Sequence, residues 1–346
     1  MVLFSGLTAL AFGIPSLLLV RLLFGAAEGP FASNVNKTVS RWFPQDERAT
    51  ALGLGNAGTP LGGAIAGPIV GLLAVAFGWR VPFVVIALLG LAWVAAWLLI
   101  ATDRPDQNRW VNEVERRKIA ASSGNSAAPA TGMPFLFYLK QPAVIATTCA
   151  FFSYTYLLYF FLSWFPSYLI SAQHLSVQRM SVVSAIPWLL GFAGFVIGGF
   201  VCDWLLRRTG NALLARKLVL VTSLLIAGLC VGLAGMSEGV NAAVALMAVS
   251  VFFMYVAGHT YWALILEVVE PAKVGAVGGF AHFIANLSGI IAPIATGYLV
   301  EWTDAFTSAF VLAGCVAAFG ALAVAFFVRT GARLKAMPEI PAARPL

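Results

Sequence analysis

An arginine and a glutamate, Arg21 and Glu28, lie inside a long apolar segment that runs from about residue 15 to residue 36. They are seven residues apart, so on a helix they share one face, about 10 Å apart along the axis. A charge at membrane depth costs roughly 2.5–3.5 kcal/mol on insertion scales. A helix accepts that cost where the pair faces a protein interior or a wet cavity, either as a static ion pair that fixes helix packing or as a substrate or proton site. We favour the second role, because no other apolar stretch carries an acid and a base at helical spacing.

The composition indicates an integral membrane protein whose surroundings are a lipid bilayer. The 346 residues are 60% hydrophobic and only 10% charged, whereas a soluble domain is roughly 25% charged. The net charge is +7, and the basic residues behind it flank the apolar segments. This placement points to membrane topology and not to a nucleic-acid partner. The cysteines lie in apolar segments without metal-ligand spacing, so we expect small buried hydrophobes and neither disulfides, metal nor cofactor. They are Cys149, Cys202, Cys230 and Cys315.

Apolar runs of about 20 residues, the length that crosses a bilayer, predict an all-α polytopic protein with nine complete spans and part of a tenth. The partial span is 1–12, which has no basic region and no cleavage site and so does not resemble a signal peptide. The complete spans are expected at 14–36, 50–77, 81–101, 143–170, 181–205, 216–236, 242–266, 274–300 and 306–328.

Positive charges are distributed unequally between the two sides of these spans. Of the 21 Lys and Arg residues, Arg21 lies within a span, and Arg80 and Arg179 fall in loops on one side. The remaining 18 fall on the opposite side or in the C-terminal segment. This asymmetry predicts that those loops and the C-terminus are cytoplasmic.

One long polar and then basic loop divides the chain into two predicted bundles, and we expect a short surface helix at 108–121 within it. The predicted domains are a helical bundle at 1–101, a cytoplasmic linker at 102–142, a six-helix bundle at 143–330 and a cytoplasmic tail at 331–346.

An internal repeat supports two related halves. Arg48–Gly53 resembles Lys273–Gly278, and Pro68-Ile69 matches Pro293-Ile294, all at one offset of 225 residues. Parallel repeats are typical of two-bundle transporters, and this offset would begin the first half about 80 residues before Met1. We therefore expect the first bundle to be incomplete, lacking two helices and part of a third.

Glycines recur at small-xxx-small spacing between residues 53 and 71, notably at Gly63, Gly67 and Gly71. This spacing lets helix backbones approach closely, so we interpret the segment as a helix-packing surface.

The stretch Gly199–Gly210 joins two spans and contains Asp203, Arg207 and Arg208. It resembles the loop signature of the major facilitator superfamily, in which the acid caps a helix end and pairs with arginines to latch the cytoplasmic face. Asn211 and Leu213 interrupt the usual basic pair. The alternative interpretation is ordinary positive charge on a cytoplasmic loop.

Three motifs resemble the anion:cation symporter branch of that superfamily, which contains sugar-acid/proton symporters such as the D-galactonate transporter. The first is Arg21-xxx-Gly25-xx-Glu28, and the second is Arg41-Trp-Phe-Pro44 followed by Glu47-Arg48. The third is the aromatic run 156–169, which is similar to the seventh helix of that family. The resemblance extends over essentially the whole chain.

The resemblance implies roles for individual residues. Glu28 would take and release the coupling proton, and Arg21 would stabilise its carboxylate. Hydroxyl, amide and aromatic groups suit a polyol chain with one carboxylate, and the alternative for each is a helix–helix hydrogen bond. The substrate-binding candidates are Tyr159, Asn286, Thr260 and Trp262, together with Asn56 and Thr59, which face a comparable depth by spacing. His259 and His282 are either a second proton group or further helix–helix hydrogen bonds.

The sequence therefore predicts a proton-coupled symporter of a small organic anion, and we expect a sugar acid such as a hexonate, hexuronate or aldarate. We expect alternating access by a monomer in a bacterial inner membrane. One alternative is an organophosphate:phosphate antiporter, which would need paired arginines, but the span at 143–170 has no Lys or Arg. The other is a non-transporting truncated membrane protein. An intramembrane enzyme is disfavoured, since the spans contain no Ser/His, paired Asp or metal set.

Overall fold

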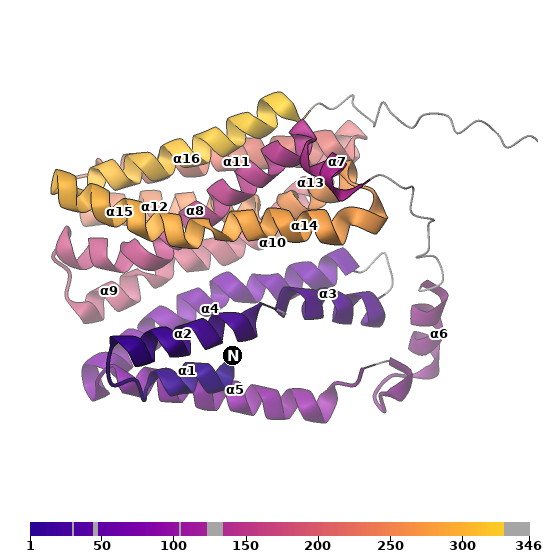
Figure 1. Cartoon of the computed structure of the whole chain (residues 1–346), viewed down its shortest axis with the longest axis horizontal. Coiled ribbons are helices and arrows are strands. Elements are labelled where there is room, and N and C mark those ends of the chain that lie inside the picture. Colours follow the sequence, from indigo (N-terminus) through magenta and orange to yellow (C-terminus); the bar gives the residue numbers. More distant parts are fainter. Residues whose placement is uncertain (30, 44–47, 104, 123–133, 329–346) are drawn as a thin grey trace, which may run out of the picture. The chain divides into compact units, whose positions relative to one another are not determined.

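A computed structural model describes residues 1–29, 31–43, 48–103, 105–122 and 134–328. Within these ranges the secondary structure is entirely helical (Figure 1), which confirms the predicted fold class. The chain divides into two compact units. Unit 1 comprises Met1–Ala128 and His174–Leu189, and unit 2 comprises Pro129–Gln173 and Leu190–Leu346.

The helices of unit 1 are short at its beginning and long thereafter. They are α1 (Val2–Thr8), α2 (Ile14–Glu28), α3 (Phe31–Trp42), α4 (Arg48–Phe77), α5 (Arg80–Ile100), the 3₁₀ turn η1 (Pro105–Gln107), α6 (Glu113–Ser122) and α9 (Val177–Val183).

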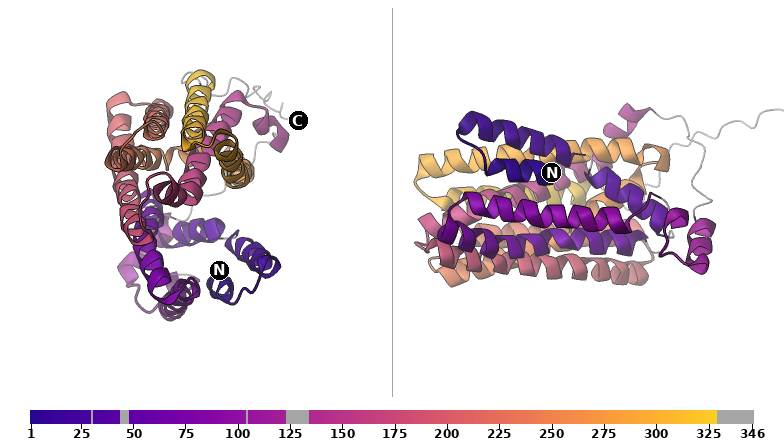
Figure 2. Two further views of the ribbon diagram at one scale, coloured as in Figure 1. Left: turned by 90° about the vertical axis from the view of Figure 1, so that its left-hand side faces the viewer. Right: turned by 90° about the horizontal axis from the view of Figure 1, so that it is seen from below.

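Unit 2 contains the remaining helices, several of which are seen almost end-on in the left panel of Figure 2. They are α7 (Phe135–Leu139), α8 (Pro142–Ser171), α10 (Ala185–Thr209, from Leu190 onward), α11 (Ala212–Ala234), α12 (Val240–Val256), α13 (Thr260–Val268), α14 (Pro271–Asn286), α15 (Ser288–Thr303) and α16 (Phe306–Phe327).

Eight helical segments of the described chain are long and apolar enough to cross a membrane. Each corresponds to one of the predicted spans from 50–77 onward. The remaining prediction, 14–36, is occupied by α2 and α3, with residue 30 between them outside the described residues. In the predicted linker, α6 covers the second part of the helix expected at 108–121, and Glu113 pairs with Arg117 one turn later at 2.7 Å.

Arg80 joins α1 to α5 in unit 1. Its guanidinium donates hydrogen bonds to the carbonyl oxygens of Ala9 and Ala11 at 3.1 and 3.3 Å, just after the last turn of α1. The same group lies 4.4 Å from the centre of the Trp79 ring. A cation at a helix C-terminus satisfies carbonyls that have no partner within the helix. Arg80 therefore fixes the end of α1 against the start of α5.

The glycines of α4 form a packing surface, as their spacing predicts. A Cβ added at Gly63 would lie 3.0 Å from the Trp188 ring, and one at Gly67 would lie 3.0 Å from the Ser184 hydroxyl. At Gly71 an added Cβ would overlap the side chain of Ser181. These positions let α4 pack closely on α9 and on the first turn of α10.

We expect Gly71→Ala to destabilise the protein, because the added methyl group forces Ser181 to move. Overpacking of this kind typically costs about 1–3 kcal/mol. Gly62→Ala is the matched control, since nothing lies within 4 Å of a Cβ added there. The control should be neutral or stabilising, because alanine is favoured over glycine in a helix by up to about 1 kcal/mol. Thermal unfolding of both variants in detergent checks this prediction, and equal midpoints would contradict it.

The core of unit 2 is built around α8, which contacts helices α7 and α12 to α16. Its large aromatic side chains Phe160, Phe161 and Phe165 are fully buried. Small residues bring the neighbouring helices together, since a Cβ at Gly320 of α16 would overlap Ser153 of α8. The Ser153 hydroxyl also donates a hydrogen bond to the carbonyl of Val316 at 2.7 Å.

The short helix α7 docks on unit 2 although it lies within the predicted linker. Tyr138 is buried in a cluster with Val144 of α8 and with residues of α13 and α14. Its hydroxyl donates a hydrogen bond to a carboxylate oxygen of Glu270 at 3.1 Å. Burial raises the pKa of Tyr138 above its ordinary value, and the neighbouring Glu270 carboxylate adds to the increase. The last residues of the linker segment therefore belong structurally to unit 2.

Candidate functional site

Arg21 and Glu28 both lie on the single continuous helix α2, so the shared face predicted from their spacing is present. Both side chains are exposed on unit 1. The described part of the chain contains no ion pair between them. Instead the Arg21 guanidinium lies 5.7 Å from the centre of the Phe83 ring on α5. The static ion pair, which was the alternative role for these two residues, is therefore not formed within the described ranges, and the proton-coupling role remains a prediction.

Asn56 and Thr59 lie on one face of α4, three residues apart. Both side chains are exposed. Neither has a hydrogen-bond partner within the residues that the structure describes. Their amide and hydroxyl groups are therefore available on the surface of unit 1.

Tyr159 and Asn286 meet in unit 2. The Tyr159 hydroxyl of α8 donates a hydrogen bond to the Asn286 side-chain oxygen at 2.9 Å. The Asn286 amide nitrogen donates in turn to the His282 carbonyl at 2.8 Å. A Cβ at Gly289 would lie 3.0 Å from the Tyr159 ring, so this glycine admits the ring beside α15. Because a side-chain amide has two hydrogens to donate, one of those of Asn286 remains unused in the described chain.

Two predicted spans of unit 2 are interrupted, and the interruptions coincide with candidate residues. The first break separates α12 from α13 and ends at Thr260, and the second separates α14 from α15 and begins after Asn286. Breaks free backbone groups from their helical partners, which membrane proteins tolerate where the backbone is covered or lines a cavity. The Thr260 hydroxyl is buried and donates to the Ala257 carbonyl at 2.6 Å. Thr260 therefore stabilises its break, which leaves it no hydroxyl hydrogen for a ligand.

Trp262 is the third residue of α13 and is about one third exposed, at 36%. Its ring is 6.1 Å from that of Phe151 and 5.9 Å from that of His282, centre to centre. The His282 ring stacks on Phe151 at 5.4 Å with a 15° tilt. His259 instead donates a hydrogen bond from Nε2 to the Phe195 carbonyl of α10 at 3.2 Å. His259 thus bonds to the neighbouring helix α10, as the helix-packing alternative expects, and part of the Trp262 ring is exposed on unit 2.

The predicted latch residues lie at the end of α10. Asp203, Arg207 and Arg208 are all exposed, and the Arg208 guanidinium lies 5.3 Å from the centre of the Trp204 ring. The structure shows no ion pair among these three residues in the described ranges, and the latch remains a prediction.

An ion pair that sequence reasoning missed joins Arg216 of α11 to Glu267 of α13. The Arg216 guanidinium also donates to the Ala263 carbonyl at 2.9 Å. No local pattern connects two residues so far apart in the chain, although both lie near ends of apolar segments. The pair ties the second part of an interrupted span to its neighbour.

We expect a double-mutant cycle on Arg216 and Glu267 to give a coupling free energy of about 0.5–1 kcal/mol. The side chains are only 24% and 36% exposed, so the coupling free energy should lie near the upper end of the range for surface pairs. The remaining solvent screening keeps it below that of a buried pair. Arg216→Ala, Glu267→Ala and the double variant would be compared by thermal unfolding in detergent. Arg208→Ala combined with Glu267→Ala serves as the control and should show no coupling. Additivity within error for the Arg216 cycle would refute the prediction.

No three His, Cys, Asp or Glu side chains gather closely enough to hold a metal ion within the described residues. The candidate groups are an acid and a base on a shared face of α2 in unit 1, and aromatic, amide and hydroxyl groups in unit 2. These groups suit binding of a polar organic anion and exchange of a proton.

Comparison with known proteins identifies the family. The model of the Major Facilitator Superfamily matches residues 1–261. The chain belongs to the Major Facilitator Superfamily. A relative named "Hexuronate transporter" from Bacillus subtilis is 49% identical over 94% of this chain and 76% of its own length. "Probable galactarate/D-glucarate transporter GarP" from Escherichia coli is 31% identical over 94% and 75%.

The fold likeness agrees with the family. The crystal structure of a bacterial homologue of the human lysosomal transporter Spinster, inward-facing and unoccupied, superposes with a TM-score of 0.65. It is 16% identical, and the likeness covers 94% of this chain and 81% of that one. As a member of the Major Facilitator Superfamily the protein is an integral membrane protein of a transporter family and not an enzyme. The predicted family and fold class are thereby confirmed.

Proposed function

We propose that the protein carries sugar acids, with a hexuronate as the preferred substrate, into a bacterial cell by symport with protons. The observation that carries this proposal is the 49% identity, over 94% of the chain, to the protein named as a hexuronate transporter. Three further relatives are named for galactonate, galactarate/glucarate and sulfoacetate transport. Small carboxylates and sulfonates are therefore the class to test.

In this proposal the proton and the anion are handled by different groups. Glu28 takes a proton on the outer side and releases it inside, and Arg21 stabilises the carboxylate. In unit 2 the substrate polyol meets the unused Asn286 amide hydrogen and the open face of Trp262. In unit 1 the exposed Asn56 and Thr59 are separate candidates for polar contacts. Tyr159 orients Asn286 through its hydrogen bond. Thr260 contributes by stabilising the helix break before Trp262.

Transport proceeds by alternating access between the two bundles in the inner membrane. The uneven distribution of Lys and Arg orients the chain with the basic loops and the C-terminus in the cytoplasm. Asp203, Arg207 and Arg208 lie on that side, where they would latch the cytoplasmic face when the protein opens outward.

An uptake assay with the full chain in proteoliposomes tests the proposal. The panel contains a hexuronate, a hexonate, an aldarate and sulfoacetate, with the neutral parent hexose as a matched control lacking the carboxylate. We expect the hexuronate to be taken up fastest, uptake to rise when the outside is acidified, and a protonophore to abolish accumulation. Failure to take up any acid, or accumulation that the protonophore leaves unchanged, would refute the proposal.

A further inference from the structure

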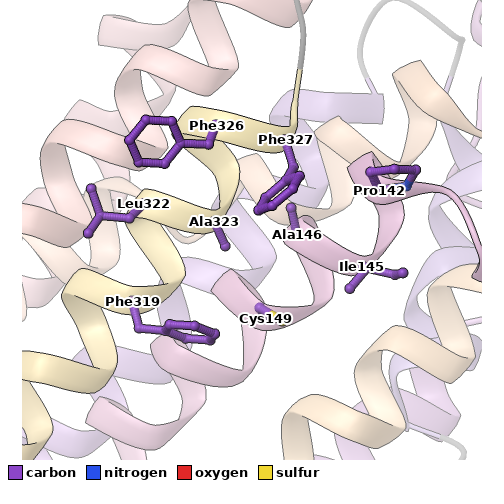
Figure 3. A pocket seen from close by; sticks show the side chains of 9 residues that line it. All are labelled: Pro142, Ile145, Ala146, Cys149, Phe319, Leu322, Ala323, Phe326 and Phe327. Atoms are coloured by element: carbon purple, nitrogen blue, oxygen red, sulfur yellow. The ribbon is translucent and has the colours of Figure 1, made fainter.

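An apolar groove runs along unit 2 between α8 and α16 (Figure 3). Its volume is about 510 Å³, within the range of roughly 300–1,000 Å³ found for small-molecule sites. It is lined from α8 by Pro142, Ile145, Ala146 and Cys149, and from α16 by Phe319, Leu322, Ala323, Phe326 and Phe327. Apart from the Cys149 thiol, every lining side chain is hydrocarbon.

The large side chains of α16 that line the groove are exposed on the described protein. Phe319 is 61% exposed and Phe326 is 70% exposed, and with Leu322 they recur every three or four residues on one face. A polar ligand entering such a groove would lose its hydration without gaining hydrogen bonds. The groove therefore suits a hydrocarbon chain. Because α8 and α16 are both membrane-spanning helices, the hydrocarbon available to the groove is an acyl chain of a bilayer lipid.

Positive charge marks one end of the groove, where α8 begins and α16 ends. Figure 3 shows Pro142 and Phe327 at this end. The exposed Lys140 precedes Pro142 by two residues. The Lys217 ammonium donates hydrogen bonds to the carbonyls of Ala325 and Val328, at 2.7 Å each, on either side of Phe326 and Phe327. The acid that contacts α7 in the described structure, Glu270, accepts the hydrogen bond of the Tyr138 hydroxyl.

We propose that this groove binds one acyl chain of an anionic phospholipid, with the phosphate of the lipid beside Lys140. Two other occupants fit the charge less well. The chain's own segment 329–346 carries four basic residues and one acid, so Lys140 and Lys217 would repel it. A second copy of the chain carries the same net charge of +7 and so does not complement these lysines. The phosphate of phosphatidylglycerol supplies the opposite charge at the level where an acyl chain leaves the headgroup region.

The Cys149 thiol reports occupancy in the unmodified protein. The full chain would be reconstituted in phosphatidylcholine alone and with added phosphatidylglycerol, and then alkylated with a membrane-permeant maleimide. Peptide mass spectrometry separates Cys149 on α8 from Cys315, which is exposed on α16 and does not line the groove. We expect phosphatidylglycerol to slow alkylation of Cys149 about fivefold, the factor that about 1 kcal/mol for a cationic side chain gives. Cys315 should be unaffected. Equal alkylation rates of Cys149 in both lipids would overturn the proposal.

Two pairs of variants separate the groove from the charge, with retained phosphatidylglycerol counted by native mass spectrometry. Ala323→Phe fills the groove and should abolish retention, whereas Ala245→Phe, at an exposed alanine on α12, should not. Lys140→Glu should weaken retention of phosphatidylglycerol about fivefold or more. Arg116→Glu, at an exposed arginine on α6, is its control. Unchanged retention in Lys140→Glu, or equal losses in a variant and its control, would overturn the proposal even if Ala323→Phe fails to fold.

Discussion

Replacing Glu28 by glutamine is expected to abolish uphill accumulation of the sugar acid. Glutamine keeps the shape and hydrogen-bonding ability of the side chain but cannot carry a proton. For one coupled proton, each pH unit across the membrane is worth about 1.4 kcal/mol, which sustains about a tenfold substrate gradient. The wild type should therefore reach about tenfold accumulation in a one-unit gradient, and Glu28→Gln should stop near equality. Proteoliposomes with an imposed pH gradient and radiolabelled hexuronate provide the measurement.

Two controls make this result interpretable. Counterflow exchange, which needs binding and reorientation but no net proton movement, should survive in Glu28→Gln and thereby show that the variant is folded. Glu115→Gln, at an exposed acid on α6, should accumulate substrate like the wild type. If Glu28→Gln still concentrates substrate, another group carries the proton, and His282 would be the next candidate.

Replacing Asn286 by leucine is expected to lower kcat/KM for uptake by roughly 5- to 150-fold. Leucine has a similar shape but leaves the substrate hydroxyl and the Tyr159 hydroxyl without the amide, and an unsatisfied buried polar group costs about 1–3 kcal/mol. Tyr159→Phe should have a smaller effect, of a few-fold, because Tyr159 orients Asn286 through the 2.9 Å bond and does not itself bind substrate. Initial uptake rates over a range of hexuronate concentrations separate the effect on KM from that on kcat.

Tyr168→Phe is the matched control for the aromatic hydroxyl. Tyr168 lies on the same helix α8, but its hydroxyl accepts a hydrogen bond from the Gln173 side chain at 2.8 Å, away from the candidate site. The Tyr168→Phe variant should therefore take up hexuronate at the wild-type rate. A larger loss in Tyr159→Phe than in Asn286→Leu would instead assign direct substrate contact to the tyrosine hydroxyl.

Hydropathy predicted where the chain crosses the membrane, but not where its helices break. The break between α12 and α13 and the break at Leu287 both lie within apolar runs that sequence averaging treats as continuous. A broken and an unbroken helix of the same composition have the same hydropathy. The glycine spacing of α4 was more informative, because Gly63, Gly67 and Gly71 specify how closely a neighbouring backbone may pack.

The candidate site was predictable only where it depends on spacing within one helix. Arg21 and Glu28 share a face because helical periodicity requires it. The hydrogen bond of Tyr159 with Asn286 and the ion pair of Arg216 with Glu267 join residues far apart in sequence. Such pairs depend on which helices pack together. The latch motif pointed to Asp203 at the end of α10, whereas the ion pair found in unit 2 joins Arg216 to Glu267.

The docking of α7 on unit 2 bears on how the polypeptide could be divided into two separately expressed fragments. Tyr138 is buried against α8, α13 and α14 and is hydrogen-bonded to Glu270. A cut just before Pro142 would therefore leave Tyr138 on the N-terminal fragment, separated from the helices that bury it. A cut upstream of Pro134 keeps Tyr138 with the helices that it covers. Co-expressed halves designed in this way should reassemble more efficiently than halves divided at the first residue of α8.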